Sequence, residues 1–336
     1  MKKIFIKLAR LFGYEIIDQN NFVSPTLGKE LNDDLSIINE KSIILPLGNV
    51  NITKKVSSLL IILRMNTEVE IWDQNKKRLF EQSKIEYSVR SINSLIKSIK
   101  FCENKHPLIK IKTVIIDDHS KKENLEKIQK LIQNQNIEII SLDHEKYKTH
   151  IKEQKSLETF SNLASLLQSF EVGKNQGDDL IFFMEDDYIH FETMLEEMIA
   201  SYERIASQIK SDIIMCPSDY PYLYMNNEKT NILIGSKRHW RTVRQTLCTF
   251  MTSKNLLDKY WDNFYKTCLD RQDPFEKYIN EIYEKEICIS PIKSLSLHLT
   301  NINSSYGLAP FIDYKKLWDA NNYKSPLREG AFYLTN

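Results

Sequence analysis

The alternation of apolar and polar positions from Val56 to about Met184 predicts strands and helices in turn. Runs that are apolar on both faces predict strands at 58–63, 109–116, 137–141 and 180–184. Longer amphipathic stretches between them predict helices at about 87–101, 122–134 and 157–170. Such strands, alternating with helices, are typical of a mostly parallel sheet that helices cover on both faces. The predicted fold class is therefore α/β.

The first 55 residues follow a different pattern. Residues 1–13 predict a helix whose apolar half holds Ile4, Phe5, Leu8, Ala9, Leu11 and Phe12, and whose basic half holds Lys2, Lys3, Lys7 and Arg10. This pattern fits an anionic membrane surface and equally fits docking on the chain's own domain. Residues 18–55 are polar and contain prolines and glycines, which predicts a linker or irregular arm. We expect residues 1–55 to form an N-terminal amphipathic helix and arm, and 56–336 the main domain.

The composition excludes several classes of protein. Of 336 residues, 42% are hydrophobic, which is enough for a buried core and too many for a disordered chain. Lys and Arg total 46 against 45 for Asp and Glu, so no overall charge attracts nucleic acid. The five cysteines form no C-x-x-C pair, which excludes a zinc knuckle and favours a reduced, cytoplasmic location. The longest apolar runs are about five residues, too short to span a bilayer, so a membrane contact would be peripheral and on the inner face.

Two predicted strands end in acidic residues. The strand at 109–116 runs into Asp117, Asp118, His119 and Ser120, and the strand at 180–184 runs into Glu185, Asp186 and Asp187. Neighbouring carboxylates repel one another unless a cation or hydrogen-bond donors offset the repulsion. A divalent ion such as Mn²⁺ or Mg²⁺, bound together with a diphosphate, would do so, whereas each cluster alone could equally be a solvated turn or a helix cap. Because ligands bind beyond the carboxyl ends of the strands in open α/β sheets, the two clusters predict one site.

These motifs resemble those of GT-A nucleotide-sugar glycosyltransferases, close in pattern to the large family 2, over about residues 56–191. In that family a D-D-x-S motif contacts the base and ribose of the donor, which implies donor binding by Asp117 and Asp118. A later acidic motif holds the ribose and the metal–diphosphate. It implies donor binding by Glu185 and Asp186, and metal binding by Asp187.

The resemblance also covers the segments around these motifs. The family has an Asn-bearing helix under the donor site, which implies a donor contact from Asn162. His119 stands where the family has Gly, in a left-handed turn that His tolerates better than most residues. The first strand ends in Arg64 and Asn66 in place of the family's Pro-x-Tyr-Asn, and both are predicted to bind the donor.

Two residues of the second half complete the chemistry that such an enzyme needs. His298 is a candidate second metal ligand, because some GT-A enzymes add a late histidine; otherwise it is a structural histidine on an apolar strand. An inverting enzyme needs a carboxylate base near the acceptor, and the family carries it at a helix start beyond the metal motif. Asp273, followed by Pro274, fits that place as the catalytic base or as an N-cap alone. Glu276 would close a capping box with it.

Residues 237–244 are dense in basic and aromatic side chains. Strand alternation places Trp240 and Arg241 on opposite faces. Trp240 is predicted to stack on a sugar ring, and Arg241 to bind phosphate or an anionic acceptor. The alternative is a solvated hairpin.

These features predict a metal-dependent, inverting hexosyl- or N-acetylhexosaminyltransferase. It would have a nucleotide-sugar half at 56–190 and an acceptor half at 191–336, and would act on a growing surface glycan or a lipid-linked acceptor. One alternative is a nucleotidyltransferase that activates a sugar phosphate, disfavoured because no Gly-rich loop follows Leu63. The other is a catalytically degenerate glycan-binding or scaffolding protein of the same fold. A Rossmann dehydrogenase is disfavoured because no G-x-G-x-x-G follows a strand.

Overall fold

The computed structural model describes residues 2–14, 16, 36–44, 48–68, 78–152, 156–225, 229–300 and 307–323. Of the predicted linker, residues 18–35 and 45–47 lie outside these described residues. No helix within the described ranges is both long and apolar enough to cross a bilayer. All five cysteines are buried and none forms a disulfide.

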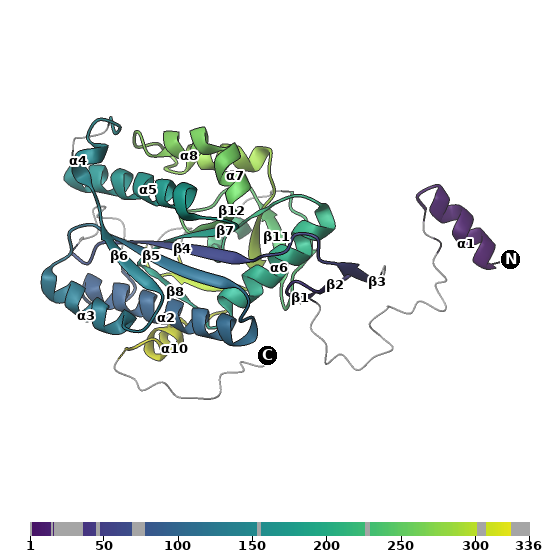
Figure 1. The fold of residues 1–336 in the computed structure, drawn as a ribbon, viewed down its shortest axis with the longest axis horizontal. Helices are drawn as coiled ribbons and strands as arrows, with labels where there is room; N and C mark the ends of the chain where they lie inside the picture. Colours follow the sequence, from purple (N-terminus) through teal and green to yellow (C-terminus); the bar gives the residue numbers. More distant parts are fainter. Residues whose placement is uncertain are drawn as a thin grey trace.

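A nine-stranded sheet forms the centre of the molecule (Figure 1), in the order β10-β11-β13-β9-β12-β7-β4-β5-β6. The four strands predicted from the sequence are present as β4 (Ser58–Met65), β5 (Lys110–Asp117), β6 (Ile137–Ser141) and β7 (Leu180–Glu185). β4 pairs in parallel with both β5 and β7, and β5 pairs in parallel with β6. The α/β fold with parallel strands is therefore confirmed.

The later part of the chain extends this sheet with strands of mixed direction. These strands are β9 (Ile214–Met215), β10 (Ile232–Ile234), β11 (His239–Val243), β12 (Phe250–Ser253) and β13 (Cys288–Ile292). β12 runs antiparallel to β7 and so reverses the direction of the sheet. A separate antiparallel pair joins β8 (Tyr188–His190) to β14 (Ser296–His298).

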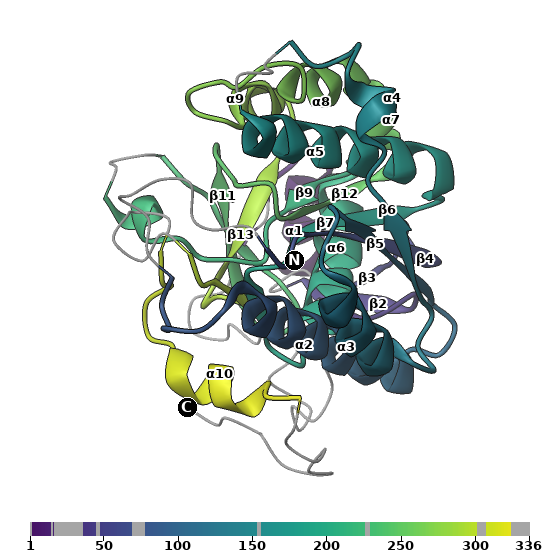
Figure 2. The same ribbon diagram turned by 90° about the vertical axis from the view of Figure 1, so that its left-hand side faces the viewer.

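Helices cover both faces of the sheet, as predicted (Figure 2). One face carries α2 (Lys84–Lys105), α3 (Lys122–Ile132) and α6 (Met194–Ile209), and the other carries α5 (Leu157–Gln176), α7 (Lys254–Lys259) and α8 (Trp261–Thr267). The remaining short helices are α4 (His144–Tyr147), α9 (Lys277–Asn280), α10 (Tyr314–Ala320) and the 3₁₀ turns at Pro221–Tyr224 and Glu281–Glu284.

Strand β4 shows why the predicted strands are apolar on both faces. Leu59 and Ile61 lie in the core against α2 and α6, whereas Leu60 and Ile62 lie in the core against α5. All four side chains are at most 4% exposed. Full burial of a Leu or Ile side chain contributes about 1.5–3 kcal/mol, so a strand with one polar face could not take this position.

The N-terminal helix is present as α1 (Lys2–Leu11). Its apolar side chains stay largely exposed: 66% for Phe5, 82% for Leu11 and 74% for the following Phe12. No described part of the chain covers these side chains.

Part of the predicted linker is instead an ordered sheet. β1 (Ser36–Ile37), β2 (Lys41–Ile44) and β3 (Gly48–Asn51) form a three-stranded antiparallel unit. A left-handed turn at Asn39, with φ of 65°, connects the first two strands. The linker prediction was wrong here, because strands this short carry too few apolar positions for a visible alternation.

Helix α6 holds this arm against the domain. The buried carboxylate of Glu203 accepts hydrogen bonds from the backbone N–H of Asn39 (2.5 Å) and from that of Val56 (2.6 Å). One turn further, the Ser207 hydroxyl accepts from the backbone N–H groups of Thr53 and Lys54, at 3.0 and 2.9 Å.

Replacing Glu203 should detach the arm. In Glu203→Ala the N–H groups of Asn39 and Val56 lose their acceptors, and a buried donor without a partner costs about 1–3 kcal/mol. We expect the free energy of unfolding in urea to fall by about 2–4 kcal/mol. The matched control Glu40→Ala removes an exposed carboxylate from the same turn and should stay within about 0.5 kcal/mol of the unchanged protein. A loss below about 1 kcal/mol for Glu203→Ala would contradict this anchoring role.

Candidate active site

The carboxyl ends of the parallel strands gather the predicted site residues at one edge of the sheet. Arg64 on β4 lies in register with Glu185 on β7, and its neighbour Met65 with Asp117 on β5. Asp117 is in turn in register with Ser141 at the end of β6. The two acidic motifs are far apart in the sequence, yet both lie at the carboxyl ends of strands that flank β4.

Two carboxylates of the second motif are paired with cations of the protein. Arg64 Nη2 lies 2.7 Å from Glu185 Oε1. Lys84 Nζ, at the start of α2, lies 2.5 Å from Asp186 Oδ1, and the Ser88 hydroxyl donates to the other oxygen of Asp186. Protein side chains thus offset part of the repulsion that the sequence suggested a metal ion would offset.

The third carboxylate, Asp187, contacts two residues from β14 and the segment just after it. Its Oδ2 lies 3.1 Å from Nε2 of His298 and accepts a hydrogen bond of 2.6 Å from the Thr300 hydroxyl. Pairing of β14 with β8 places His298 opposite Tyr188, on whose ring it stacks at 4.7 Å. His298 therefore lies beside Asp187, while its role as a metal ligand stays a prediction.

The pKa values of Glu185 and Asp187, the first and last carboxylates of this triplet, shift in opposite directions. Burial raises the pKa of Glu185, which Arg64 only partly counteracts. Burial also acts to raise the pKa of Asp187, but His298, Lys84 and Thr300 outweigh it and hold that pKa well below its usual range. Of these two carboxylates, Asp187 therefore stays ionised more readily than Glu185.

The pair of Asp187 and His298 fits a divalent ion that a diphosphate would complete. Oδ1 of Asp187 is buried and has no hydrogen-bond partner among the described residues. A carboxylate oxygen and an imidazole nitrogen 3.1 Å apart are at the spacing of adjacent ligands that each lie about 2.1 Å from one ion. Mn²⁺ and Mg²⁺ would suit this pair only with the oxygens of a diphosphate in the remaining ligand positions.

The first motif forms a tight turn at the end of β5. Asp117 is buried, accepts a hydrogen bond from the backbone N–H of Ser120 (3.2 Å), and has its pKa raised by burial. His119 has a φ of 57°, which confirms the predicted left-handed turn. Asp118 points toward β4, where Asn66 donates to its Oδ2 at 3.0 Å.

Two neighbouring residues of helix α5 connect the two motifs, each through its own hydrogen bonds. Arg64, which pairs with Glu185, also donates from Nη1 to Oδ1 of Asn162 at 2.8 Å. The preceding residue, Ser161, lies 3.1 Å from Nε2 of His144. That nitrogen is 2.9 Å from Oδ1 of Asp118. Asn162 therefore lies between the two motifs, and its contact with a donor stays a prediction.

Trp240 is not where the sequence prediction placed it. Its side chain is fully buried in the core beneath the sheet, and its indole N–H points to Ser201 (3.1 Å) and Glu197 (3.3 Å). The prediction that Trp240 stacks on a sugar ring was wrong, because the large ring fills the space between β11 and α6. A basic neighbourhood in the sequence does not distinguish a buried tryptophan from an exposed one.

Arg241 faces the other side of the strand, as predicted. Its guanidinium forms a buried ion pair with Asp219 and lies 4.2 Å from the centre of the Tyr224 ring. The chain thus provides an anionic partner for this cation. Its predicted role in binding phosphate or acceptor stays a prediction.

The segment from Asp273 to Glu276 differs from the predicted helix start. Asp273 is exposed and precedes a cis peptide bond to Pro274, and the helix begins only at Lys277. The predicted capping box is wrong, because the residue at the cap position is Glu276 and its side chain makes no cap hydrogen bond. Burial raises the pKa of Glu276 to about 7, with Glu185 adding to the shift and Arg64 opposing it.

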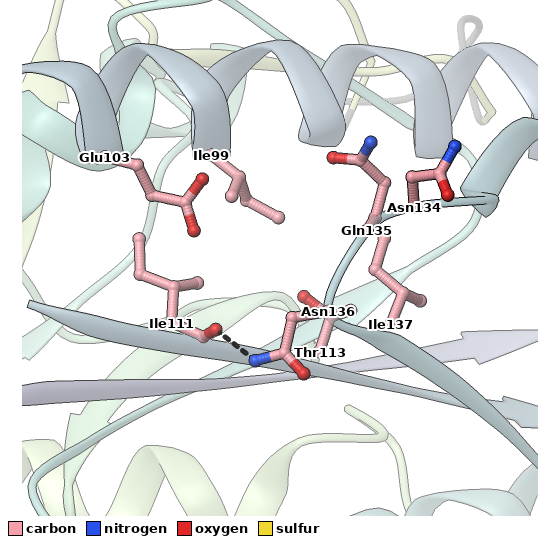
Figure 3. A pocket seen from close by; sticks show the side chains of 8 residues that line it. All are labelled: Ile99, Glu103, Ile111, Thr113, Asn134, Gln135, Asn136 and Ile137. Atoms are coloured by element: carbon pink, nitrogen blue, oxygen red, sulfur yellow. Dashed lines mark hydrogen bonds between the residues drawn. The ribbon is translucent and has the colours of Figure 1, made fainter. Parts of the chain in front are cut away.

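A small cavity of about 140 Å³ lies elsewhere in the molecule (Figure 3). Its lining comes from α2 and from the segments that begin β5 and β6, including Glu103, Ile111 and Gln135. These segments lie at the amino edge of the parallel strands, opposite the acidic motifs. Ligand pockets usually hold about 300–1,000 Å³, so this cavity is too small for a nucleotide-sugar.

Several residues of the site carry no signal in the sequence. Lys84, Ser88 and Thr300 reach the acidic triplet from distant segments, and nothing in their surroundings marks them. His144 could have been found, because it comes three residues after a predicted strand that ends at the same edge as Asp118.

Comparisons with known proteins give structural neighbours only. No family model matches the chain, and no curated protein matches it. Among solved structures, the chain is similar to TarS 1–349 of S. aureus (10% identity, TM-score 0.40, 69% of this chain and 57% of that one). It is also similar to an active-site mutant of LgtC (12%, 0.36, 67% and 70%) and to glucosyl-3-phosphoglycerate synthase of Mycobacterium tuberculosis (11%, 0.31, 60% and 58%).

These neighbours are GT-A glycosyltransferases. The chain spans little more than half of the TarS fragment. At these TM-scores the likeness does not assign a function.

The Lys84–Asp186 ion pair gives the site a testable energetic signature. Lys84→Met should lower the free energy of unfolding in urea by about 3 kcal/mol, because it leaves a buried carboxylate without its cation. Combining it with Asp186→Asn should cost less than the sum of the two single changes. The control Lys105→Met, at the exposed opposite end of α2, should cost less than about 1 kcal/mol. Additive losses in the double variant would contradict the pairing.

Proposed function

We propose that this chain is a glycosyltransferase that moves a sugar from a nucleoside diphosphate sugar to a glycan or lipid-linked acceptor. One observation carries the proposal. The two acidic motifs lie at the carboxyl ends of β5 and β7, the strands that flank β4. A set of hydrogen bonds joins the motifs into one polar surface through Arg64, Asn162, Ser161 and His144. A ligand with a base and ribose at one end and a diphosphate at the other matches that arrangement.

The first motif would hold the nucleoside. Asp118 and Asn66 offer an acceptor and a donor of hydrogen bonds at the end of β5 and β4. Asp117 keeps one buried oxygen, Oδ1, without a hydrogen-bond partner among the described residues. Such an oxygen is stabilised when a ligand donates a hydrogen bond to it.

The second motif would hold the diphosphate and its metal ion. Asp187 and His298 would bind the ion, while Glu185 and Asp186 support the turn through Arg64 and Lys84. A bound Mn²⁺ or Mg²⁺ supplies positive charge to the leaving diphosphate. Lys84 and Arg64 add fixed positive charge at the same edge.

The rival functions lack an equivalent observation. A nucleotidyltransferase would need a phosphate loop after β4, and the described part of that segment, up to Glu68, contains no glycine. A scaffolding protein would not need a buried carboxylate oxygen such as Asp187 Oδ1, which has no hydrogen-bond partner among the described residues. The acidic triplet, with its paired cations and one unpaired oxygen, favours an enzyme.

The test is hydrolysis of a panel of nucleotide-sugars, with and without Mn²⁺. We expect one donor class to be hydrolysed in the presence of metal, and EDTA to abolish this activity. Asp187→Asn should abolish it too, because a metal-bound carboxylate contributes several kcal/mol to stabilising the transition state. Circular dichroism should show an unchanged fold. Full activity of Asp187→Asn, or full activity in EDTA, would contradict the metal proposal.

The catalytic base is proposed to come from the segment that contains Asp273 and Glu276. Asp273 is the candidate that the family resemblance implies. Glu276 is favoured by its surroundings, because its pKa of about 7 suits a base that works near neutral pH. Sugar transfer by an inverting enzyme requires such a group to accept the proton of the acceptor hydroxyl.

The pH profile separates the two carboxylates. With Glu276 as the base, kcat/KM should rise with pH through about 7, because only the deprotonated form accepts a proton. We expect Glu276→Gln to lose this rise and about 10²–10⁴-fold of kcat, whereas Asp273→Asn keeps the profile. The reverse result would make Asp273 the base.

We also propose that α1 brings the enzyme to an anionic membrane surface that presents a lipid-linked acceptor. Its exposed Phe5, Leu11 and Phe12 support this, since nothing in the described chain covers them. The four basic residues of the helix contribute about 1 kcal/mol each near an anionic surface.

Removal of residues 1–13 should release the protein from vesicles that contain anionic lipid. Hydrolysis of the soluble donor should be unchanged, and binding of the full chain should weaken with salt, since ionic attraction is screened over about a Debye length. Vesicles of neutral lipid are the control. If the truncated protein unfolds or aggregates instead, α1 packs on its own domain.

A further inference from the structure

A second group of metal-binding side chains lies at the carboxyl ends of β5 and β6. One ligand atom from each of Asp118, His119 and His144 lies within 4.8 Å of the others. Nε2 of His144 is 2.9 Å, and Nδ1 of His119 is 3.3 Å, from the same oxygen of Asp118. None of these residues belongs to the pair of Asp187 and His298.

The spacing of these atoms suits a single ion. Ligands that lie about 2.1 Å from Zn²⁺ are about 3.0 Å apart at a right angle and about 3.4 Å apart in a tetrahedron. The distances of 2.9 and 3.3 Å from the two histidine nitrogens to Asp118 match these ligand–ligand spacings. The two histidine nitrogens lie within 4.8 Å of each other, and the rings are 4.5 Å apart with their planes tilted by 32°.

The surroundings orient the ligands. Asn66 donates to the second oxygen of Asp118 at 3.0 Å, which fixes the carboxylate so that its first oxygen faces the histidines. Ser161 Oγ lies 3.1 Å from Nε2 of His144, the nitrogen that would bind the ion, so this contact breaks when an ion enters. The hydrogen bond from Asn66 to Asp118 is the contact that orients a ligand, and bonds of that kind raise metal affinity. The His119 side chain is 61% exposed, which leaves the cluster open to an ion from solution.

We propose that Asp118, His119 and His144 form a binding site for a transition-metal ion of the Zn²⁺ class. This site binds the ion in the absence of nucleotide. Two imidazoles and one carboxylate suit Zn²⁺, Co²⁺ or Ni²⁺, and do not suit Mg²⁺, which prefers oxygen ligands. The site contributes three protein ligands, whereas Asp187 and His298 contribute two and depend on diphosphate oxygens to complete the shell.

Occupation of this site opposes donor binding. Asp118 uses the same carboxylate for the ion and, in the proposed function, for the nucleoside. A Zn²⁺ ion on it therefore competes with the nucleoside diphosphate. This consequence rests on the proposed function, whereas the binding of the ion does not.

The first experiment measures Zn²⁺ binding to the full, tag-free chain, freed of metal and without nucleotide. We expect calorimetry to give one ion per chain, and Co²⁺ to give visible absorption bands. His144→Ala and His119→Ala should each weaken binding at least tenfold. Two control variants should bind Zn²⁺ as tightly as the unchanged protein does. One is Asp187→Asn, and the other is His150→Ala, which removes an exposed histidine that is hydrogen-bonded to Tyr265.

No binding without nucleotide, or equal binding by His144→Ala, would overturn the site. Loss of binding in Asp187→Asn would assign the ion to the other pair and would overturn it too. Thermal melts of the variants show whether each is folded, and His119→Ala, at an exposed position, keeps the test independent of folding.

The second experiment measures the affinity for the nucleoside diphosphate of the preferred donor, with Mg²⁺ present, as Zn²⁺ is added. The apparent Kd should rise with Zn²⁺ in the unchanged protein and stay constant in His144→Ala. An equal rise in both, or no rise in either, would overturn the competition. If no nucleotide binds at all, the proposed function fails while the zinc titration still decides the site.

Discussion

Repulsion among carboxylates at one edge of the sheet is the constraint on which this site depends. Parallel strands bring their carboxyl ends together, and in the second motif Asp187 and Asp186 add to the rise that burial causes in the pKa of Glu185. Arg64 on β4 offsets this repulsion by pairing with Glu185, and Lys84 on α2 does so by pairing with Asp186. Both ion pairs are largely buried, and such pairs need further hydrogen bonds to offset their desolvation. Those bonds come from Asn162 and Ser88, which is how α5 and α2 are tied to the site.

The second half of the chain contributes to the same edge by a different route. β12 pairs antiparallel to β7, and β14 pairs with β8, directly after the acidic turn. This arrangement brings His298 to Asp187 across 111 positions of sequence. The first acidic motif therefore lies on the parallel strands alone, whereas Asp187 of the second motif also has a partner from the later part of the chain.

Much of this arrangement was predictable from the sequence, and the errors have a common cause. The four parallel strands and the helices between them follow from local periodicity, which reports how a segment is buried on each face. The predictions for Trp240 and for residues 36–51 are wrong because contacts with α6 place both segments, and neither segment reveals those contacts. Asp273, predicted as the catalytic base or as an N-cap, does not cap a helix, because the helix begins only at Lys277 with Glu276 at its cap position.

The sequence by itself determined the α/β fold, the strand ends that carry both acidic motifs, and the left-handed turn at His119. These depend on residues within one element or one turn, where bond geometry and burial act over short separations. Only the tertiary structure decided which cation meets which carboxylate. Lys84 and Asp186, for example, are 102 positions apart, and their contact exists only because α2 packs against the sheet. Electrostatic interactions act through space, so the charge balance of the site follows from packing and not from order along the chain.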